Sequence, residues 1–222
     1  MPTMKANAKI ITNSFIEYLD KKYTNKTITT EISINTSYGV KVVDVVVSNG
    51  HSVAFEIKSE LDTIKRLDSQ VKGYSEIFEY VYLVYWKDKF NIEDMNLPDN
   101  IGIIVANWNP KQTQIKFEIL KSARINRIAN QEKIASLLWK DELFYFLNKK
   151  DIYPKKNYAK EILVNLFEKY HTKTEAIKIF RFILKKRFEK GFLKYQESKR
   201  TPDCLDIFKT HKVDLNYLSY LK

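Results

Sequence analysis

The 222-residue chain has a single cysteine, Cys204, only three histidines, and only five glycines and five prolines. One cysteine excludes a disulfide within the chain and any cysteine-rich metal cluster, as is usual for proteins of reducing compartments. The histidines lack the paired spacing of a zinc site. So few glycines and prolines leave little room for a long flexible linker. The sequence therefore predicts a folded protein of the cytoplasm.

Long hydrophobic runs are missing as well. No stretch approaches the roughly 18 apolar residues of a membrane span, and the opening MPTMKANAKI has no continuous apolar core like that of a signal peptide. The sequence also contains no GKS or GKT, which excludes a Walker-type phosphate loop. We therefore expect no membrane partner and no ATP hydrolysis by that route.

The charge of the chain is distributed unevenly. Residues 1–120 contain 14 Lys and Arg against 15 Asp and Glu, whereas residues 121–222 contain 24 against 12, so the formal charge of +11 comes from the second part. A basic region binds polyanions because neutralised phosphates release their counterions. The charge therefore indicates a nucleic acid partner, although a solvated lysine-rich surface explains the same composition.

The spacing of apolar residues predicts an α/β fold with a mixed sheet. The expected elements are helix 6–24, strands 27–36, 40–48 and 51–59, helix 61–80, strand 81–86, a loop over 87–100, and strands 101–107 and 115–120. Because a helix connects strands 51–59 and 81–86, these two strands run parallel, whereas the hairpin before them is antiparallel. The order is therefore helix, three strands, helix, strand, followed by two more strands.

The C-terminal part of the chain has helical rather than strand periodicity. We therefore divide the chain into an α/β domain over residues 1–122 and a basic helical domain over residues 123–222. The helices are expected over 124–150, 158–171 and 174–192, the last of them with Thr174 as its N-cap.

Charged side chains interrupt two of the apolar strands. Asp44 lies within VKVVDVVVS, where a carboxylate is costly unless a cation compensates it. On the next strand Glu56 and Lys58 are two residues apart, so their side chains share a face. Two carboxylates on adjacent strands suit Mg²⁺ or Mn²⁺, with Lys58 placed to orient an attacking water or to neutralise a phosphate. An interior salt bridge between Asp44 and Lys58 is the alternative.

Such a site requires an irregular hairpin. If Asn49 and Gly50 formed a two-residue turn, facing residue numbers would have an odd sum, and Asp44 would point away from Glu56. A shared face requires an even sum, which a three-residue loop that includes His51, or a bulge, would provide. The sequence therefore predicts one of these two irregularities.

The succession of Asp44, Glu56 and Lys58, followed by a helix with Gln70 and Tyr74 at Q-x-x-x-Y spacing, resembles the PD-(D/E)XK nuclease superfamily and its RecB-like branch. The stretch FEIKSELDTIKRLDSQVKGY is also similar to a little-characterised bacterial and phage group with an E-I-K-S, D-T, R-L, Q, Y pattern. Gln70 and Tyr74 lie on one helical face, where Tyr74 also fits the core.

The resemblance covers roughly residues 6–120 and implies a restriction-endonuclease-like αβββαβ core with metal-dependent hydrolysis of DNA. Val43 stands at the position of the family's proline. The residues implied as catalytic are Asp44, Glu56, Lys58 and Gln70, and those implied as holding Mg²⁺ or Mn²⁺ are Asp44, Glu56, Ile57 and a further acidic residue. For the further acidic residue we choose Glu31 over Glu17, because Glu31 lies in the strand before Asp44, whereas Glu17 suits a helix surface.

Several basic and aromatic residues are expected to contact DNA. Arg66, four residues before Gln70, and Tyr74 are placed near the site, although Arg66 would also suit a surface ion pair with Asp62. In the expected helix over residues 174–192, which we call the tail, the candidates are Lys178, Arg181 and Lys185. They lie at i, i+3 and i+7, opposite an apolar stripe. A solvated helix surface is the alternative for the tail.

Three functions are compatible with these observations. The first is a Mg²⁺- or Mn²⁺-dependent deoxyribonuclease. The second is a catalytically silent, nuclease-like module that binds nucleic acid or a protein in a phage or defence system. The third is an interaction protein whose basic tail contacts an acidic partner. The sequence leaves open whether the chain acts as a homodimer or with a protein partner.

Overall fold

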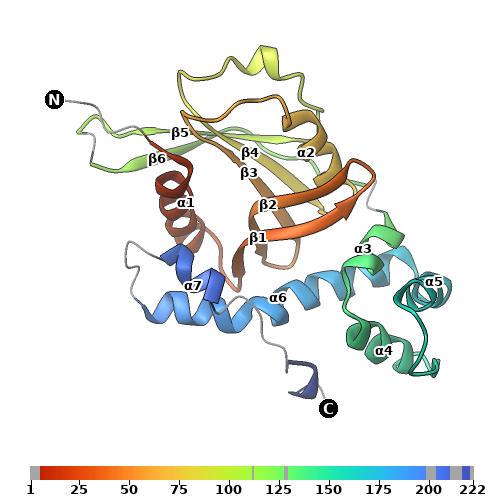
Figure 1. The fold of residues 1–222 in the computed structure, drawn as a ribbon. Helices are drawn as coiled ribbons and strands as arrows, with labels where there is room; N and C mark the ends of the chain where they lie inside the picture. The colour runs from red at the N-terminus through yellow and green to blue at the C-terminus, as the bar shows by residue number, and fades with distance from the viewer. Residues whose placement is uncertain (1–5, 112, 128–129, 199–203, 211–216, 221–222) are drawn as a thin grey trace.

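The computed structural model describes residues 6–111, 113–127, 130–198, 204–210 and 217–220. A six-stranded sheet forms its centre, with the strands in sequence order across it (Figure 1). The strands are β1 (Thr27–Thr36), β2 (Gly39–Ser48), β3 (Ser52–Lys58), β4 (Tyr80–Trp86), β5 (Gly102–Trp108) and β6 (Ile115–Lys121). The α-helices are α1 (Ala8–Lys22), α2 (Leu67–Ser75), α3 (Gln131–Leu137), α4 (Lys140–Asn148), α5 (Lys160–Tyr170), α6 (Lys173–Glu197) and α7 (Cys204–Thr210), with 3-10 turns η1 (Ile92–Met95) and η2 (Tyr217–Tyr220). None of the helices in these ranges is long and apolar enough to cross a membrane.

The sheet is mixed. β1, β2 and β3 form an antiparallel meander, β3, β4 and β5 run parallel, and β6 returns antiparallel to β5. The helical crossover through α2 makes β3 and β4 parallel, as parallel neighbours require a connection that returns to the same end of the sheet. The prediction of a mixed α/β fold is confirmed, and the strand bounds agree with the predicted ones to within one residue at each end.

Each face of the sheet is covered by its own hydrophobic cluster. On one face Phe15 of α1 packs edge-on against Phe55, in a cluster that includes Val45. On the other face Tyr74 of α2 lies in a cluster with Val46. Neighbouring residues of β2 thus serve opposite faces, as the two-residue period of a strand requires. The sheet is therefore the middle layer between α1 and α2.

Helices α3, α4, α5 and most of α6 share a hydrophobic cluster with α2 and the sheet. Figure 1 shows α6 running along the β1–β2 side of the sheet, with α3, α4 and α5 beyond the hairpin. Glu79, just before β4, accepts hydrogen bonds from both Nε and Nη2 of Arg181 on α6. The predicted division between residues 122 and 123 thus follows a change in composition, while the core itself is continuous across it.

The helix predicted over residues 61–80 is much shorter in the structure. α2 begins only at Leu67 and ends at Ser75. Before it, the Asp62 carboxylate accepts hydrogen bonds from the backbone N and the hydroxyl of Ser59, at 2.8 and 2.6 Å. This local side-chain bonding stabilises a turn in place of the first helical turns.

Two further helix predictions were wrong in detail. The expected helix over residues 124–150 is divided into α3 and α4, separated by Leu138 and Trp139 in extended conformation. The N-cap of α6 is Thr172 and not Thr174, because Thr172 forms a reciprocal capping box with Glu175.

Candidate active site

The β2–β3 hairpin has the irregular turn that a two-carboxylate site requires. Ser48 pairs with Ser52, so residues 49–51 form a three-residue loop. Gly50 in this loop has φ of +97°, a left-handed conformation that glycine adopts without strain. Facing residue numbers of the two strands therefore have an even sum. The prediction of an odd-length loop is confirmed, and the two carboxylates fall in register.

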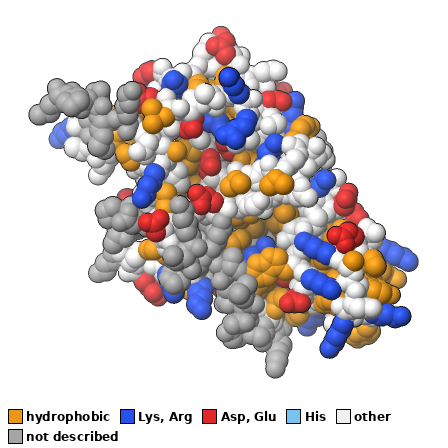
Figure 2. Space-filling view, viewed as in Figure 1, with side chains coloured by type: hydrophobic (Ala, Val, Ile, Leu, Met, Phe, Trp, Pro, Cys, Tyr) orange, Lys and Arg blue, Asp and Glu red, His pale blue; other side chains and the backbone are white. Residues whose placement is uncertain are grey.

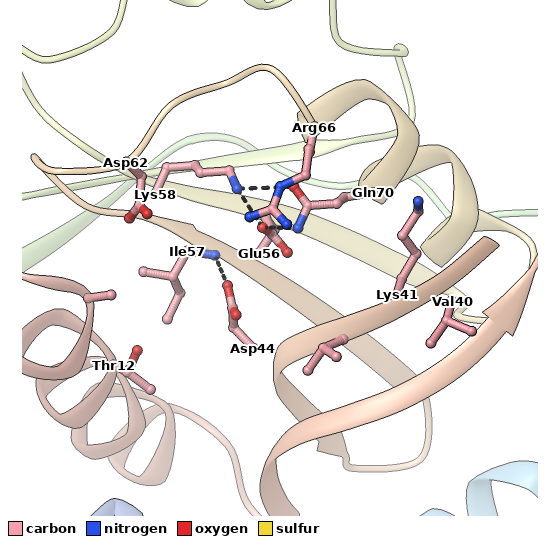
Figure 3. A pocket seen from close by; sticks show the side chains of 12 residues that line it. Thr12, Val40, Lys41, Asp44, Glu56, Ile57, Lys58, Asp62, Arg66 and Gln70 are labelled. Carbon is pink, nitrogen blue, oxygen red and sulfur yellow. Dashed lines mark hydrogen bonds and ion pairs between the residues drawn. The ribbon is translucent and has the colours of Figure 1, made fainter. Parts of the chain in front are cut away.

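Asp44 lies where β2 separates from β3. The last pair of these strands is Val45 with Phe55, and beyond it Asp44 Oδ2 accepts a hydrogen bond of 2.7 Å from the backbone N of Ile57. The carboxylate thus takes the place of a strand carbonyl. A cavity of about 370 Å³ opens beside it, and both Asp44 and Glu56 line this cavity, with Asp44 just below Glu56 in Figure 3.

Glu56 is the centre of a buried hydrogen-bond network from β3 and α2. Its Oε1 accepts from Lys58 Nζ at 2.7 Å and from Gln70 Nε2 at 2.6 Å, and its Oε2 accepts from Tyr74 Oη at 2.6 Å. Lys58 Nζ also donates to Gln70 Oε1 at 3.0 Å. Glu56 and Lys58 are only 2% and 5% exposed. The structure therefore brings Gln70 and Tyr74 to Glu56, and the fully buried side chain of Tyr74 has the core position that was the alternative to its expected contact with DNA.

The electrostatics of the site disfavour a free negative charge on Asp44. Burial, and then the charge of Glu56, raise the pKa of Asp44 to about 8, while the Ile57 N–H and Lys58 act in the opposite direction. Burial and the neighbouring Glu56 also raise the pKa of the Tyr74 hydroxyl, which stays a hydrogen-bond donor. Deprotonation of Asp44 beside Glu56 would leave an excess of negative charge over the Lys58 ammonium, and a bound cation would compensate it.

The oxygen atoms that Asp44 and Glu56 offer to a metal suit a hard divalent cation. Asp44 Oδ1 has no hydrogen-bond donor among the described residues, and Asp44 and Glu56 both line the cavity. Carboxylate oxygens are the ligands that Mg²⁺ and Mn²⁺ prefer. The described residues contain no group of three or more His, Cys, Asp or Glu side chains arranged to hold a metal.

Glu31 is nearer to the site than Glu17. The pairs Thr30 with Val45 and Ile32 with Val43 place Glu31 opposite Asp44, and both carboxylates line a second cavity of about 230 Å³. Glu31 has φ of +52°, a left-handed conformation that is unfavourable for this residue type.

Glu17 instead lines a separate cavity between α1 and β6. The choice of Glu31 as a metal ligand stays a prediction, and the geometry gives no support to Glu17.

Comparison with known proteins places the chain in a phage family. The sequence model described as "Bacteriophage P4 protein cII" matches residues 2–221. The chain belongs to this family. Protein cII of Enterobacteria phage P4 is 30% identical to it over 175 residues, which are 77% of this chain and 62% of that protein.

The match thus spans less than two thirds of the phage P4 protein. No solved structure matches the chain. The cII descriptions confirm a phage association and name no reaction, so any activity has to be argued from the site itself.

Several further side chains of this cII-family protein line the site cavity. Arg66 is exposed at the start of α2, and Lys41 and Thr12 come from β2 and α1. Figure 3 shows Arg66 reaching over the cavity beside Gln70. The expected alternative pairing of Arg66 with Asp62 is replaced by the Ser59–Asp62 turn. Sequence reasoning missed Lys41 and Thr12, although Lys41 is the one basic residue in the valine-rich strand.

The three tail candidates have different surroundings. Lys178 is exposed. Lys185 Nζ donates to Asn25 Oδ1 at 2.6 Å, which leaves ammonium hydrogens for a further acceptor. Arg181 forms an ion pair with the buried carboxylate of Glu79 through Nε and Nη2, and its contact with phosphate stays a prediction. This pair could not be predicted from the sequence, because its partners are 102 residues apart.

Proposed function

We propose that this cII-family protein is a Mg²⁺- or Mn²⁺-dependent nuclease of the PD-(D/E)XK type that hydrolyses phosphodiester bonds in DNA. The observation that carries the proposal is the convergence of Asp44 and Glu56, from separate strands, on one cavity that Lys58 and Gln70 also line. The arrangement of α1, β1, β2, β3, α2 and β4 around this cavity supports a restriction-endonuclease-like core.

The proposed mechanism assigns a task to each side chain. Asp44 and Glu56 would hold the cation together with the backbone carbonyl of Ile57, and the bound cation would supply Lewis-acid stabilisation of charge on the phosphate. Lys58 uses two of its three N–H groups for Glu56 and Gln70, so the third can donate to an attacking water or to a phosphate oxygen. Gln70 fixes Lys58 by accepting its second hydrogen bond.

Substrate would reach this site past basic side chains. Arg66 and Lys41 line the cavity, and we expect them to contact phosphates of the bound strand. The exposed Lys178 on α6 extends the basic surface, and the charge of residues 121–222 supports binding to a long polyanion. Figure 2 shows basic side chains gathered over the α3–α6 region as well as near the site.

A catalytically silent module is the second candidate, and one observation favours it. All the hydrogen bonds that Glu56 accepts come from Lys58, Gln70 and Tyr74, so this carboxylate is already compensated without a cation. Such a protein would bind DNA through the same surface and leave it intact.

Cleavage assays separate these two functions. Linear, circular and single-stranded DNA should be incubated with Mg²⁺ or Mn²⁺ and with EDTA, using wild type, Asp44→Asn and Lys58→Ala. Lys111→Ala is a matched control, because Lys111 is exposed and does not line the site cavity. We expect metal-dependent cleavage by wild type and the control, and at least a hundredfold loss in the two site variants. Cleavage that is equal in all four proteins would refute the assignment, and binding without cleavage would favour the silent module.

A further inference from the structure

The wall of the site cavity formed by β2 is apolar and exposed. Val40 and Val42 line the same cavity as Asp44 and are 67% and 48% exposed, and Tyr38, at the turn before β2, is 47% exposed. We call Tyr38, Val40 and Val42 the apolar strip. Figure 2 shows hydrophobic side chains over the β1–β2 hairpin, beside the charged side chains of the site.

Packing among the residues that the structure describes does not explain the apolar strip. Val43, between the strip and Asp44, is fully buried. At this point of β2 the hydrophobic core is therefore formed by Val43 and not by the apolar strip. Val40 and Val42 are paired with Asn35 and Ser33 of β1, which are exposed polar residues that leave the valines uncovered. Exposed β-branched residues at alternate positions of a strand, leading to a charged cavity, indicate a surface that is covered by a ligand.

The opposite wall of the cavity is charged. Arg66 and Val40 lie on different sides of the cavity, and the side chain of Lys41 points from β2 to the face opposite that of Val40 (Figure 3). Lys41 Nζ donates to the Tyr38 carbonyl oxygen at 2.6 Å, which holds its positive charge next to the apolar strip. A ligand that fits both walls carries negative charge along one side and flat apolar groups along the other.

Unpaired DNA has this distribution of chemistry. In a duplex the base faces are stacked on each other, and the surface offers phosphates and base edges. In a single strand the base faces are free to contact apolar and aromatic side chains while the phosphates contact basic ones. We propose that the ligand of this cavity is single-stranded or locally unpaired DNA, with bases on the apolar strip and phosphates on Lys41 and Arg66. Cleavage of this ligand rests on the proposed nuclease function, whereas its binding does not.

Binding of an abasic strand provides the sharpest test. Fluorescence anisotropy in EDTA would compare labelled dT20, a 20-nucleotide strand with abasic sites at its centre, and a 20-base-pair duplex. We expect wild type to bind dT20 on the order of tenfold more tightly than the abasic strand, because base contacts are lost while the phosphates remain. The Val40→Ser/Val42→Ser variant should lose this preference and keep its affinity for the abasic strand.

Leu193→Ser is the matched control, because Leu193 on α6 is 50% exposed and does not line the cavity. It should retain the wild-type preference for dT20. Circular dichroism and thermal unfolding establish that each variant is folded. Because Val40 and Val42 are exposed, their replacement should leave the melting temperature within a few degrees of wild type.

Three results would overturn the inference. They are equal wild-type affinity for dT20 and the abasic strand, tighter binding of the duplex than of dT20, and a concentration-dependent dimer that dissociates in the Val40→Ser/Val42→Ser variant. A preference for an RNA strand over dT20 would overturn the assignment to DNA. If only the nuclease proposal is wrong, the result differs from these three. The protein would then bind dT20 with the expected preference but leave it uncleaved with Mg²⁺ or Mn²⁺.

Discussion

Replacement of Asp44 by Asn tests how much the buried carboxylate at this position lowers the free energy of unfolding. Burial and the charge of Glu56 raise the pKa of Asp44 from 3.8 to about 8 in the folded protein. Without a bound cation, the folded protein is therefore more stable when the Asp44 carboxyl is protonated. This contribution to stability is lost as the pH rises from the pKa of Asp44 in the unfolded chain toward its pKa in the folded protein. The amide in Asp44→Asn keeps an oxygen for the Ile57 N–H and carries no charge at any pH.

The magnitude follows from the difference between the two pKa values. At about 1.4 kcal/mol per pH unit, a rise from 3.8 to about 8 sets an upper limit of roughly 5 to 6 kcal/mol above pH 8. Asp44 keeps partial exposure to solvent, which screens the charge. We therefore expect Asp44→Asn to raise the free energy of unfolding by about 1 to 3 kcal/mol at pH 8, and by little at pH 4.

Urea unfolding in EDTA between pH 4 and pH 8.5 checks this expectation, with circular dichroism as the probe. The difference between Asp44→Asn and wild type should increase steadily with pH. Saturating Mn²⁺ should then stabilise wild type and leave the variant unchanged, because a ligand stabilises only the state that binds it. A variant that is no more stable than wild type at pH 8 would refute the reasoning about the buried charge.

The remaining predictions concern the groups around the site and the interior ion pair. Arg181→Ala should lower the free energy of unfolding by about 3 kcal/mol in urea titrations, because it leaves Glu79 buried without its guanidinium partner, and by less in a Glu79→Gln background. Although burial alone would raise the pKa of Glu79, the bonds from Arg181 and Ser52 hold it below its usual range, so the stability from this pair should be lost as the pH falls through that pKa. Tyr74→Phe should cost about 1 to 3 kcal/mol in thermal unfolding, since it removes a donor from a buried carboxylate. Glu31→Gln should weaken Mn²⁺ binding in calorimetry while Glu17→Gln does not, and equal affinities would remove Glu31 from the metal site.

The strands and the hairpin register could be predicted because they depend on neighbours in sequence. Alternating β-branched residues set the strand bounds, and the requirement that Asp44 and Glu56 share a face determined that the turn at residues 49–51 must be irregular. The helix start at Leu67 was missed because apolar spacing continues through a turn that Asp62 stabilises locally. The two signals compete, and periodicity alone does not show which one prevails.

Contacts between segments that are distant in the sequence could not be predicted. Arg181 was interpreted as a phosphate ligand because its neighbours on α6 are basic, whereas its side chain is used by Glu79. Lys41 lies in a valine-rich strand, and only the three-dimensional structure shows that it lines the cavity. Both cases depend on which elements meet in space, and helix or strand periodicity contains no information on that.

The contact between Lys58 and Glu56 distinguishes a resting nuclease from a silent module. In the metal-free site Lys58 supplies the positive charge next to Glu56, so a cation and Lys58 would compete for the same carboxylate. If the site is a nuclease, Lys58→Ala should bind Mn²⁺ several-fold more tightly than wild type in calorimetry and yet fail to cleave DNA. A silent module would bind no Mn²⁺ in the wild-type protein, because the Lys58 charge would then be the permanent partner of Glu56. Weaker Mn²⁺ binding in Lys58→Ala than in wild type would contradict the competition, since removal of a nearby positive charge has to favour a cation.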